Sequence, residues 1–146
     1  MNGIPIMNNN VNKCEINSLI VGMSESSSHL ITDSDIIQFA NLSGDKNPIH
    51  ISEEYAKNSR FKKRIAHGML SANFFSALFG TKLPGYGCVY VSQSLFFRRP
   101  VYLGDVVTAR IEIIEVNVSK SRVKFLMTCK VRQKIVIDGN AELFVP

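Results

Sequence analysis

One segment constrains the fold more than any other, because residues 67–80, HGMLSANFFSALFG, form a helical pattern with almost no polar face. A helix that is apolar on all sides is buried among other elements. With roughly 13 residues it is too short to cross a bilayer, which takes about 20. Its apolar residues are Met69, Leu70, Ala72, Phe74, Phe75, Ala77, Leu78 and Phe79. The chain therefore needs a second layer to cover this helix.

Beyond this helix the apolar residues recur at every second position, which is the period of a strand. One buried and one solvated face is typical of antiparallel sheets. The alternating apolar positions are Val91, Leu95, Phe97, Val107, Ala109, Ile111, Ile113, Val123, Phe125, Met127, Cys129 and Val131. The final segment, KIVIDGNAELFVP, has two interpretations: a hairpin turn at Asp138-Gly139, or a bulge there within one long strand.

These patterns predict an α+β fold of one domain in which an antiparallel sheet wraps around a central buried helix. The chain has 146 residues, and we expect residues 1–15 to be a poorly ordered lead-in and residues 16–146 to be the domain. Thr32 or Asp33 can cap a helix that stops at Gly44, and Ser52 begins another. A single sheet leaves edge strands open, which favours pairing with a second copy.

The stretch SGDKNPIH, residues 43–50, contains the main candidate chemistry. It places Asp45 and His50 five positions apart, with Pro48 between them to stiffen the loop. A carboxylate and an imidazole can together position one water, one accepting its proton while the other supplies or relays one. Each residue alone is commonly only a turn or surface residue, so the pair needs support from elsewhere in the chain.

That support comes from the start of the apolar helix. A helix N-terminus offers unpaired N–H groups and the positive end of the dipole, and Gly68 has no side chain to block approach. These features suit an oxyanion hole for a thioester or another carbonyl. Ser76 lies within the same helix, where its hydroxyl either belongs to a site or bonds back to a carbonyl one turn earlier.

Composition narrows the possible partners and compartments. The net charge is +5, which fits nucleic acid, an acidic protein or a phosphorylated ligand, with the densest cluster in RFKKR, residues 60–64. The aromatic residues do not alternate with the basic ones, so we expect no nucleic-acid platform. Three cysteines without a ligand spacing indicate a reducing compartment and no metal site. With no signal-peptide pattern and no apolar run of spanning length, we expect a cytoplasmic protein without a membrane segment.

Three motifs together resemble the MaoC-like hot-dog family and, within it, the (R)-specific enoyl-CoA hydratases. They are SGDKNPIH, AHGMLSANFFSALFG and GYGCVYVSQSLFFRRPVYLGD. The resemblance covers about residues 32–145. It implies a hot-dog fold that pairs into homodimers, with residues 134–146 forming one strand and the preceding turn near Gln133.

The resemblance also implies a reaction and its residues. The family adds water reversibly to a trans-2-enoyl thioester to give the (R)-3-hydroxyacyl thioester. Its catalytic pair corresponds to Asp45 and His50, its oxyanion N–H to Gly68, a site serine to Ser76, and its motif asparagine to Asn47. No metal or cofactor is implied, since coenzyme A or acyl carrier protein only carries the acyl group. The cations that could meet either carrier are Lys62, Lys63, Arg64, Arg98 and Arg99.

Four alternatives remain at this point. A 3-hydroxyacyl-[acyl-carrier-protein] dehydratase of fatty-acid synthesis would use the same residues with another carrier. A thioesterase is disfavoured, because residues 67–80 contain no Asp or Glu. A non-catalytic acyl-thioester binding module predicts that Asp45→Asn changes neither turnover nor binding. Nucleic-acid binding would have to rest on charge alone.

Overall fold

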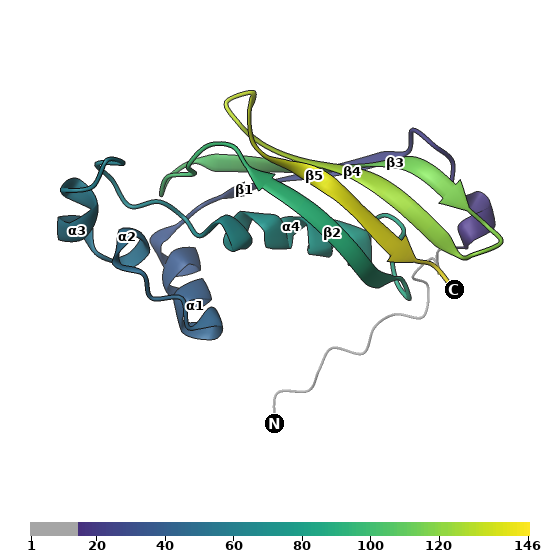
Figure 1. The fold of residues 1–146 in the computed structure, drawn as a ribbon, viewed down its shortest axis with the longest axis horizontal. Coiled ribbons are helices and arrows are strands. Elements are labelled where there is room, and N and C mark those ends of the chain that lie inside the picture. Colours follow the sequence, from purple (N-terminus) through teal and green to yellow (C-terminus); the bar gives the residue numbers. More distant parts are fainter. Residues whose placement is uncertain (1–14) are drawn as a thin grey trace.

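The computed structural model describes residues 15–146 and shows an antiparallel sheet curved around one long helix (Figure 1). The strands are β1 (Ser24–Leu30), β2 (Val89–Phe97), β3 (Val106–Asn117), β4 (Arg122–Val131) and β5 (Lys134–Phe144). The helices are η1 (Ile16–Ser18), α1 (Asp33–Ser43), α2 (Pro48–Ile51), α3 (Glu53–Lys57) and α4 (Gly68–Thr81). This arrangement confirms the predicted α+β fold. The predicted lead-in lies outside the described residues, apart from Glu15.

The strand order in the sheet is β1-β3-β4-β5-β2, so β1 and β2 are its two edges. Every neighbouring pair is antiparallel. Residues 134–144 form one strand, and Arg132 and Gln133, both with positive φ, make the turn before it. The β4–β5 register runs unbroken through Asp138 and Gly139, so the hairpin reading of that dipeptide is wrong.

Gly139 lies where two strands approach closely. A Cβ built on this residue would lie 1.9 Å from the carbonyl oxygen of Ser94 in β2, which pairs with β5. Glycine is the residue that permits such an approach of two backbones.

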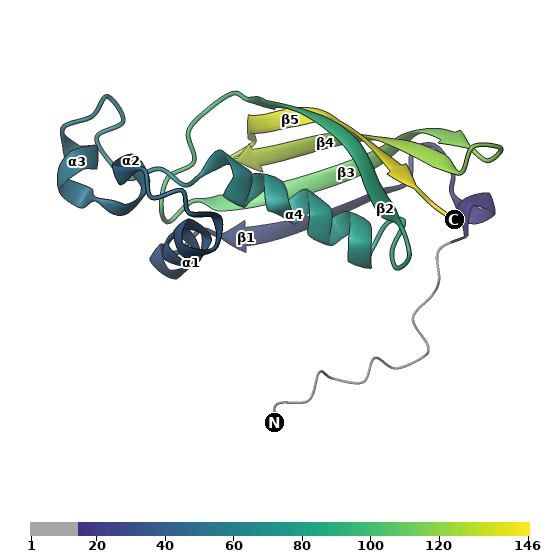
Figure 2. The ribbon, with the colours of Figure 1, turned by 60° about the horizontal axis from the view of Figure 1, so that its bottom comes forward.

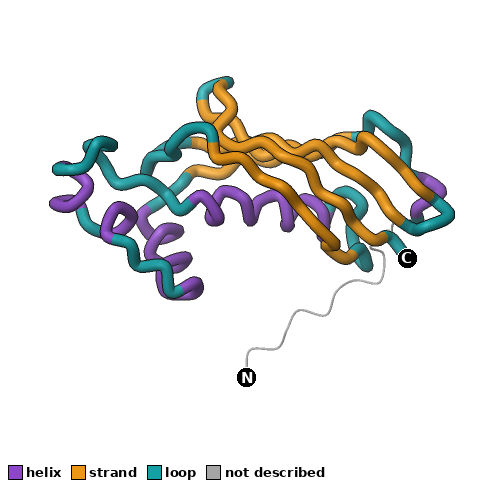
Figure 3. The backbone as a smooth tube through the Cα atoms, viewed as in Figure 1, coloured by secondary structure: helices purple, strands orange, loops and turns teal. Residues whose placement is uncertain are grey.

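Helices α1, α2 and α3 lie at one end of the sheet, beside the first turn of α4 (Figures 1 and 3). The Thr32 hydroxyl and the Asp35 carboxylate form a reciprocal capping box at the start of α1. Gly44 ends the helix in the left-handed conformation, with φ 80°. Both predicted limits of this helix are confirmed, and they place Asp45 directly after its end.

The inner face of the sheet is the core. The alternating residues of β3 and β4, Val107, Ala109, Ile111, Ile113, Val123, Phe125, Met127 and Cys129, have no exposed surface. They pack with Phe75, Leu78 and Phe79 of α4 in one hydrophobic cluster. The sheet therefore covers one face of α4, as its apolar sequence predicts.

The opposite face of α4 is open, which corrects the expectation of a helix buried on all sides. Met69, Asn73, Ser76 and Ala77 are exposed, and their spacing makes one stripe along the helix. We call these four residues the α4 stripe. Figure 2 shows the helix and β2 running side by side at the open front of the molecule. Among residues 15–146 no helix combines the length and apolarity needed to cross a bilayer.

Candidate active site

A pocket of about 490 Å³ opens at the N-terminal tip of α4. We call it the helix-tip pocket. It is lined by Asp45, His50, His67, Gly68, Ser71, Phe97 and three arginines, Arg60, Arg98 and Arg99, among others. Three of the five predicted site residues, Asp45, His50 and Gly68, therefore meet in one pocket although they come from three segments of the chain.

Asp45 is held by the loop that joins α1 to α2. Its carboxylate oxygen Oδ1 accepts a hydrogen bond from the backbone N–H of Asn47 at 3.2 Å. The side chain of Asn47 in turn caps α2 by accepting from the N–H of Ile49 at 3.3 Å. Asn47 is exposed and is absent from the pocket lining, so in this structure its visible role is to shape the loop.

His50 lies on α2 and is buried. Its Nδ1 is 2.7 Å from the carbonyl oxygen of Ile65. A carbonyl can only accept, so Nδ1 carries the proton and Nε2 of the neutral ring has a free lone pair. Burial lowers the pKa of His50, and the nearby His67 lowers it further, while the Ile65 carbonyl and Asp45 act in the opposite direction. The environment thus favours the neutral ring.

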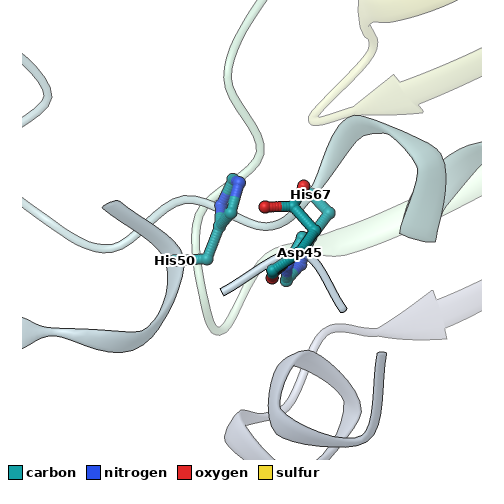
Figure 4. Close-up of side chains that lie close together, drawn as sticks. All are labelled: Asp45, His50 and His67. Carbon is teal, nitrogen blue, oxygen red and sulfur yellow. Dashed lines mark hydrogen bonds between the residues drawn. The ribbon is translucent and has the colours of Figure 1, made fainter. Parts of the chain in front are cut away.

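His67 was not predicted as a site residue, yet it contacts both members of the pair. Its Nε2 donates to the backbone carbonyl of Asp45 at 2.8 Å, and its ring stacks on that of His50 with centroids 3.9 Å apart. The ring is 2% exposed. Figure 4 shows the three side chains gathered at the tip of the helix. The sequence signal was present, since His67 directly precedes Gly68.

One side-chain nitrogen or oxygen from each of Asp45, His50 and His67 lies within 4.8 Å of the other two. Two hydrogen bonds of about 2.8 Å to one water span a comparable distance, so one water can contact two of these groups. Imidazole nitrogens and carboxylate oxygens are also atom types that bind metal ions, so the same three residues could supply metal ligands. A backbone carbonyl already engages Nδ1 of His50 and Nε2 of His67, so each ring has only its other nitrogen left for a water or an ion.

Arg64 lies behind His50 and is buried, so the expectation that it meets a carrier is wrong. Its Nε donates to the His50 carbonyl at 2.6 Å. Its Nη1 lies 2.7 Å from Asp33 and 3.2 Å from Glu53. A buried guanidinium needs such partners, and these connect the starts of α1 and α3 with α2. Lys62 and Lys63 are exposed, as expected for the cluster.

Gly68 is the first residue of α4, and its N–H forms no hydrogen bond to another residue of the described part of the chain. The ring of Phe97 in β2 packs against its Cα. A Cβ at residue 68 would lie 2.6 Å from that ring. Phe97 is 53% exposed, so it borders the pocket without closing it.

Ser76 is not part of the helix-tip pocket. Eight residues beyond Gly68, it is about 12 Å further along the helix axis. It lines a second hollow of about 420 Å³ between α4 and β2, which we call the side hollow, together with Phe39, Met69, Ala72, Asn73 and Tyr90 to Gln93. The serine that does line the helix-tip pocket is Ser71.

The fold and the sequence have clear counterparts among known proteins. The structure superimposes on an (R)-hydratase from A. caviae with a TM-score of 0.86, at 35% identity, covering 88% of this chain and 98% of that one. In sequence, the chain is 51% identical over 125 residues to an (R)-specific enoyl-CoA hydratase of Rhodospirillum rubrum, covering 86% of this chain and 87% of that protein. It is 37% identical to a mitochondrial 3-hydroxyacyl-[acyl-carrier-protein] dehydratase of Arabidopsis thaliana, covering 80% and 72%.

The sheet wrapped on a central helix and these likenesses define a hot-dog fold protein. Residues 22–135 match the model of the MaoC like domain. The chain belongs to this family, and the resemblance found in its three motifs is confirmed.

Proposed function

We propose that this protein is an (R)-specific enoyl-CoA hydratase, which adds water reversibly to trans-2-enoyl-CoA to give (R)-3-hydroxyacyl-CoA. One observation carries the proposal: Asp45, His50 and Gly68 line one pocket, and the Gly68 N–H has no partner among residues 15–146. The relatives named above support the reaction class. The reaction requires no metal or redox cofactor.

Each part of the reaction has a residue suited to it. Asp45 accepts a proton from the water as its oxygen bonds to C3 of the enoyl group. His50 orients that water through the lone pair on Nε2, and the proton that the pair takes from the water is the one that it passes to C2. Negative charge that develops on the thioester oxygen is stabilised by the Gly68 N–H at the positive end of α4. The assignment of acid and base belongs to the coupled pair as a whole.

We also propose that the protein works as a homodimer in a reducing cytoplasm. The exposed α4 stripe borders β2, an edge strand whose Val89, Val91, Phe96 and Phe97 are exposed apolar residues. A second copy added at this edge would extend the sheet and cover the stripe. Ser76 would then line an acyl-binding space that the two copies complete, which is the role we propose for it.

Two carriers of the acyl group are candidates, coenzyme A and acyl carrier protein, because the relative from Arabidopsis thaliana is a 3-hydroxyacyl-[acyl-carrier-protein] dehydratase. Arg60, Arg98 and Arg99 line the helix-tip pocket and can meet phosphate groups of either carrier. Competition between crotonyl-CoA and crotonyl-acyl-carrier-protein tests this choice. A higher kcat/KM for the protein-bound substrate would favour the dehydratase of fatty-acid synthesis.

The main test follows the loss of enoyl-thioester absorbance with crotonyl-CoA and longer trans-2-enoyl-CoA substrates. We expect the wild type to consume them and to yield the (R) product in a chiral analysis. Asp45→Asn and His50→Ala should each lower kcat by about 10²-fold or more, since each removes a group that moves a proton.

The matched control is His29→Ala, which removes an exposed histidine of β1 outside the pocket. It should leave kcat unchanged. Wild-type rates in both Asp45→Asn and His50→Ala would refute the proposed mechanism. Hydrolysis of saturated acyl-CoA, without hydration of the enoyl substrates, would indicate a thioesterase instead.

A further inference from the structure

Ser71 is a polar residue in an apolar position that nothing in the protein explains. It lies in the first turn of α4, has 0% exposed surface and lines the helix-tip pocket. Among residues 15–146 its hydroxyl has no hydrogen-bond partner. Buried hydroxyls normally have a partner, so a group missing from the protein alone is expected here.

The obvious internal partner is not used. A serine within a helix can bond back to the carbonyl four residues earlier, which here is that of His67. That carbonyl instead accepts the N–H of Leu70 at 3.1 Å, and no bond to it from the Ser71 hydroxyl forms. Among the described residues, the hydrogen-bonding capacity of this hydroxyl therefore stays unused.

The helix places this hydroxyl beside Gly68. Three residues correspond to about 4.5 Å along the axis, and residues at i and i+3 lie on the same face of a helix. Helical side chains also lean toward the N-terminus, so the Ser71 side chain extends over the turn that contains Gly68. Both residues line one pocket. Two donors, one from the backbone and one from a side chain, thus belong to neighbouring residues of one pocket lining.

We propose that the Ser71 hydroxyl is a second donor to the substrate's thioester oxygen, acting together with the Gly68 N–H. This inference deepens the proposed hydration and rests on it. A carbonyl oxygen has two lone pairs and can accept from both donors at once. As the water oxygen bonds to C3, electron density moves onto the thioester oxygen, and the two donors stabilise it until C2 takes a proton. Ser71 keeps its own proton throughout.

The first measurement compares steady-state kinetics of Ser71→Ala with the wild type, using crotonyl-CoA. Removal of one donor from an oxyanion site typically costs 10²–10³ in kcat, so a fall of about 10²-fold is expected. The melting temperature should stay equal or rise, because the variant removes an unpaired buried hydroxyl. The matched control is Thr81→Val, which removes an exposed hydroxyl at the far end of α4.

The second measurement reports directly on the thioester oxygen. A 2,4-dienoyl-CoA bound to the inactive Asp45→Asn variant should absorb at a longer wavelength than in solution, because hydrogen bonds to the oxygen polarise the conjugated system. Adding Ser71→Ala should reduce this red shift while the ligand still binds. A merely structural role of Ser71 would leave the shift unchanged.

The inference is overturned if Ser71→Ala keeps kcat within twofold of the wild type and the red shift is intact. If the alanine variant does not fold, Ser71→Cys retains a similar volume with a weaker donor, and the same two readouts apply to it. The outcomes separate the two proposals. A wild type without hydratase activity refutes the proposed function, whereas an active wild type with an equally active Ser71→Ala refutes only the role of Ser71.

Discussion

At the scale of single residues, the candidate site depends on which nitrogen of each imidazole carries the proton. The carbonyls of Ile65 and Asp45 fix Nδ1–H in His50 and Nε2–H in His67. Backbone acceptors set these tautomers without adding charge to the pocket. The His67 ring, stacked on that of His50 at 3.9 Å, adds to the lowering of the pKa of His50 that burial causes.

This environment predicts a pH-dependent stability. The pKa of His50 is lowered from 6.5, mainly by burial, so the unfolded chain binds the proton more readily than the folded one. Above about pH 6.5 the His50 ring is neutral in both states, and its contribution to the free energy of unfolding is complete. As the pH falls below 6.5 toward the lower pKa of the folded state, this contribution is lost. Melting temperatures measured between pH 8 and 5 should fall more steeply in the wild type than in His50→Gln. Parallel curves would contradict this assignment.

Sequence reasoning predicted part of the candidate site and did not single out the rest, for a physical reason. Asp45 and His50 share one stiff loop, so local spacing was enough to pair them. Ser71 becomes notable only through its burial and the lack of a hydroxyl partner among the described residues, which a one-dimensional pattern does not report. Ser76 was expected at the site by resemblance, whereas its position along α4 places it in the side hollow.

At the scale of elements, the single turn of α2 is too short to hold its own conformation. The segment after α3 fixes it with three hydrogen bonds: Ile65 N–H to the Ile49 carbonyl at 3.3 Å, Arg64 Nε to the His50 carbonyl at 2.6 Å, and the His50 ring to the Ile65 carbonyl at 2.7 Å. His50 is thus held at its backbone and at its ring by two consecutive residues.

We expect Arg64→Met to reduce both stability and activity. The change leaves the His50 carbonyl without its charged donor, a loss of about 1.5–3 kcal/mol for a hydrogen bond of this kind. Denaturant unfolding should show the destabilisation, and kcat should fall because α2 no longer holds His50 in place. Arg64→Lys should recover part of both.

The neighbouring Lys63→Met serves as the control, since Lys63 is exposed and its loss should change neither quantity. Equal kcat in Arg64→Met and the wild type would show that α2 is held by other contacts.

Element limits were the most predictable feature of the fold. The Thr32 capping box and Gly44 follow local rules that need no tertiary information. Strand alternation likewise identified the buried faces of β3 and β4. The open face of α4 was missed because Met69 and Ala77 are as apolar as residues that face a core. Apolarity alone does not tell which neighbour covers a residue.

At the scale of the whole molecule, the two sheet edges differ in character. β1, with the sequence SESSSHL, is polar and exposed, whereas β2 carries exposed valines and phenylalanines beside the α4 stripe. Burial of apolar surface is the main force in most protein association. The β2 edge is accordingly the one that we expect a second copy to cover.

Val91→Lys should shift the protein from dimer toward monomer. The substitution places a charge on the β2 edge, and charged edge residues oppose strand pairing. Light scattering coupled to size exclusion should report twice the chain mass of 16.3 kDa for the wild type and a lower average for the variant. Leu42→Lys, an equal change on an exposed apolar residue of α1, should remain dimeric. A monomeric wild type would contradict the proposed assembly.

The contact between Gly139 and Ser94 has a consequence for the ancestry of this sequence. The Cβ of any other residue at position 139 would clash with the Ser94 carbonyl oxygen. No amino-acid substitution of Gly139 is therefore expected to be neutral, unless β2 first shifts away from β5. Homologues that carry another amino acid there should have arisen through paired changes in both strands.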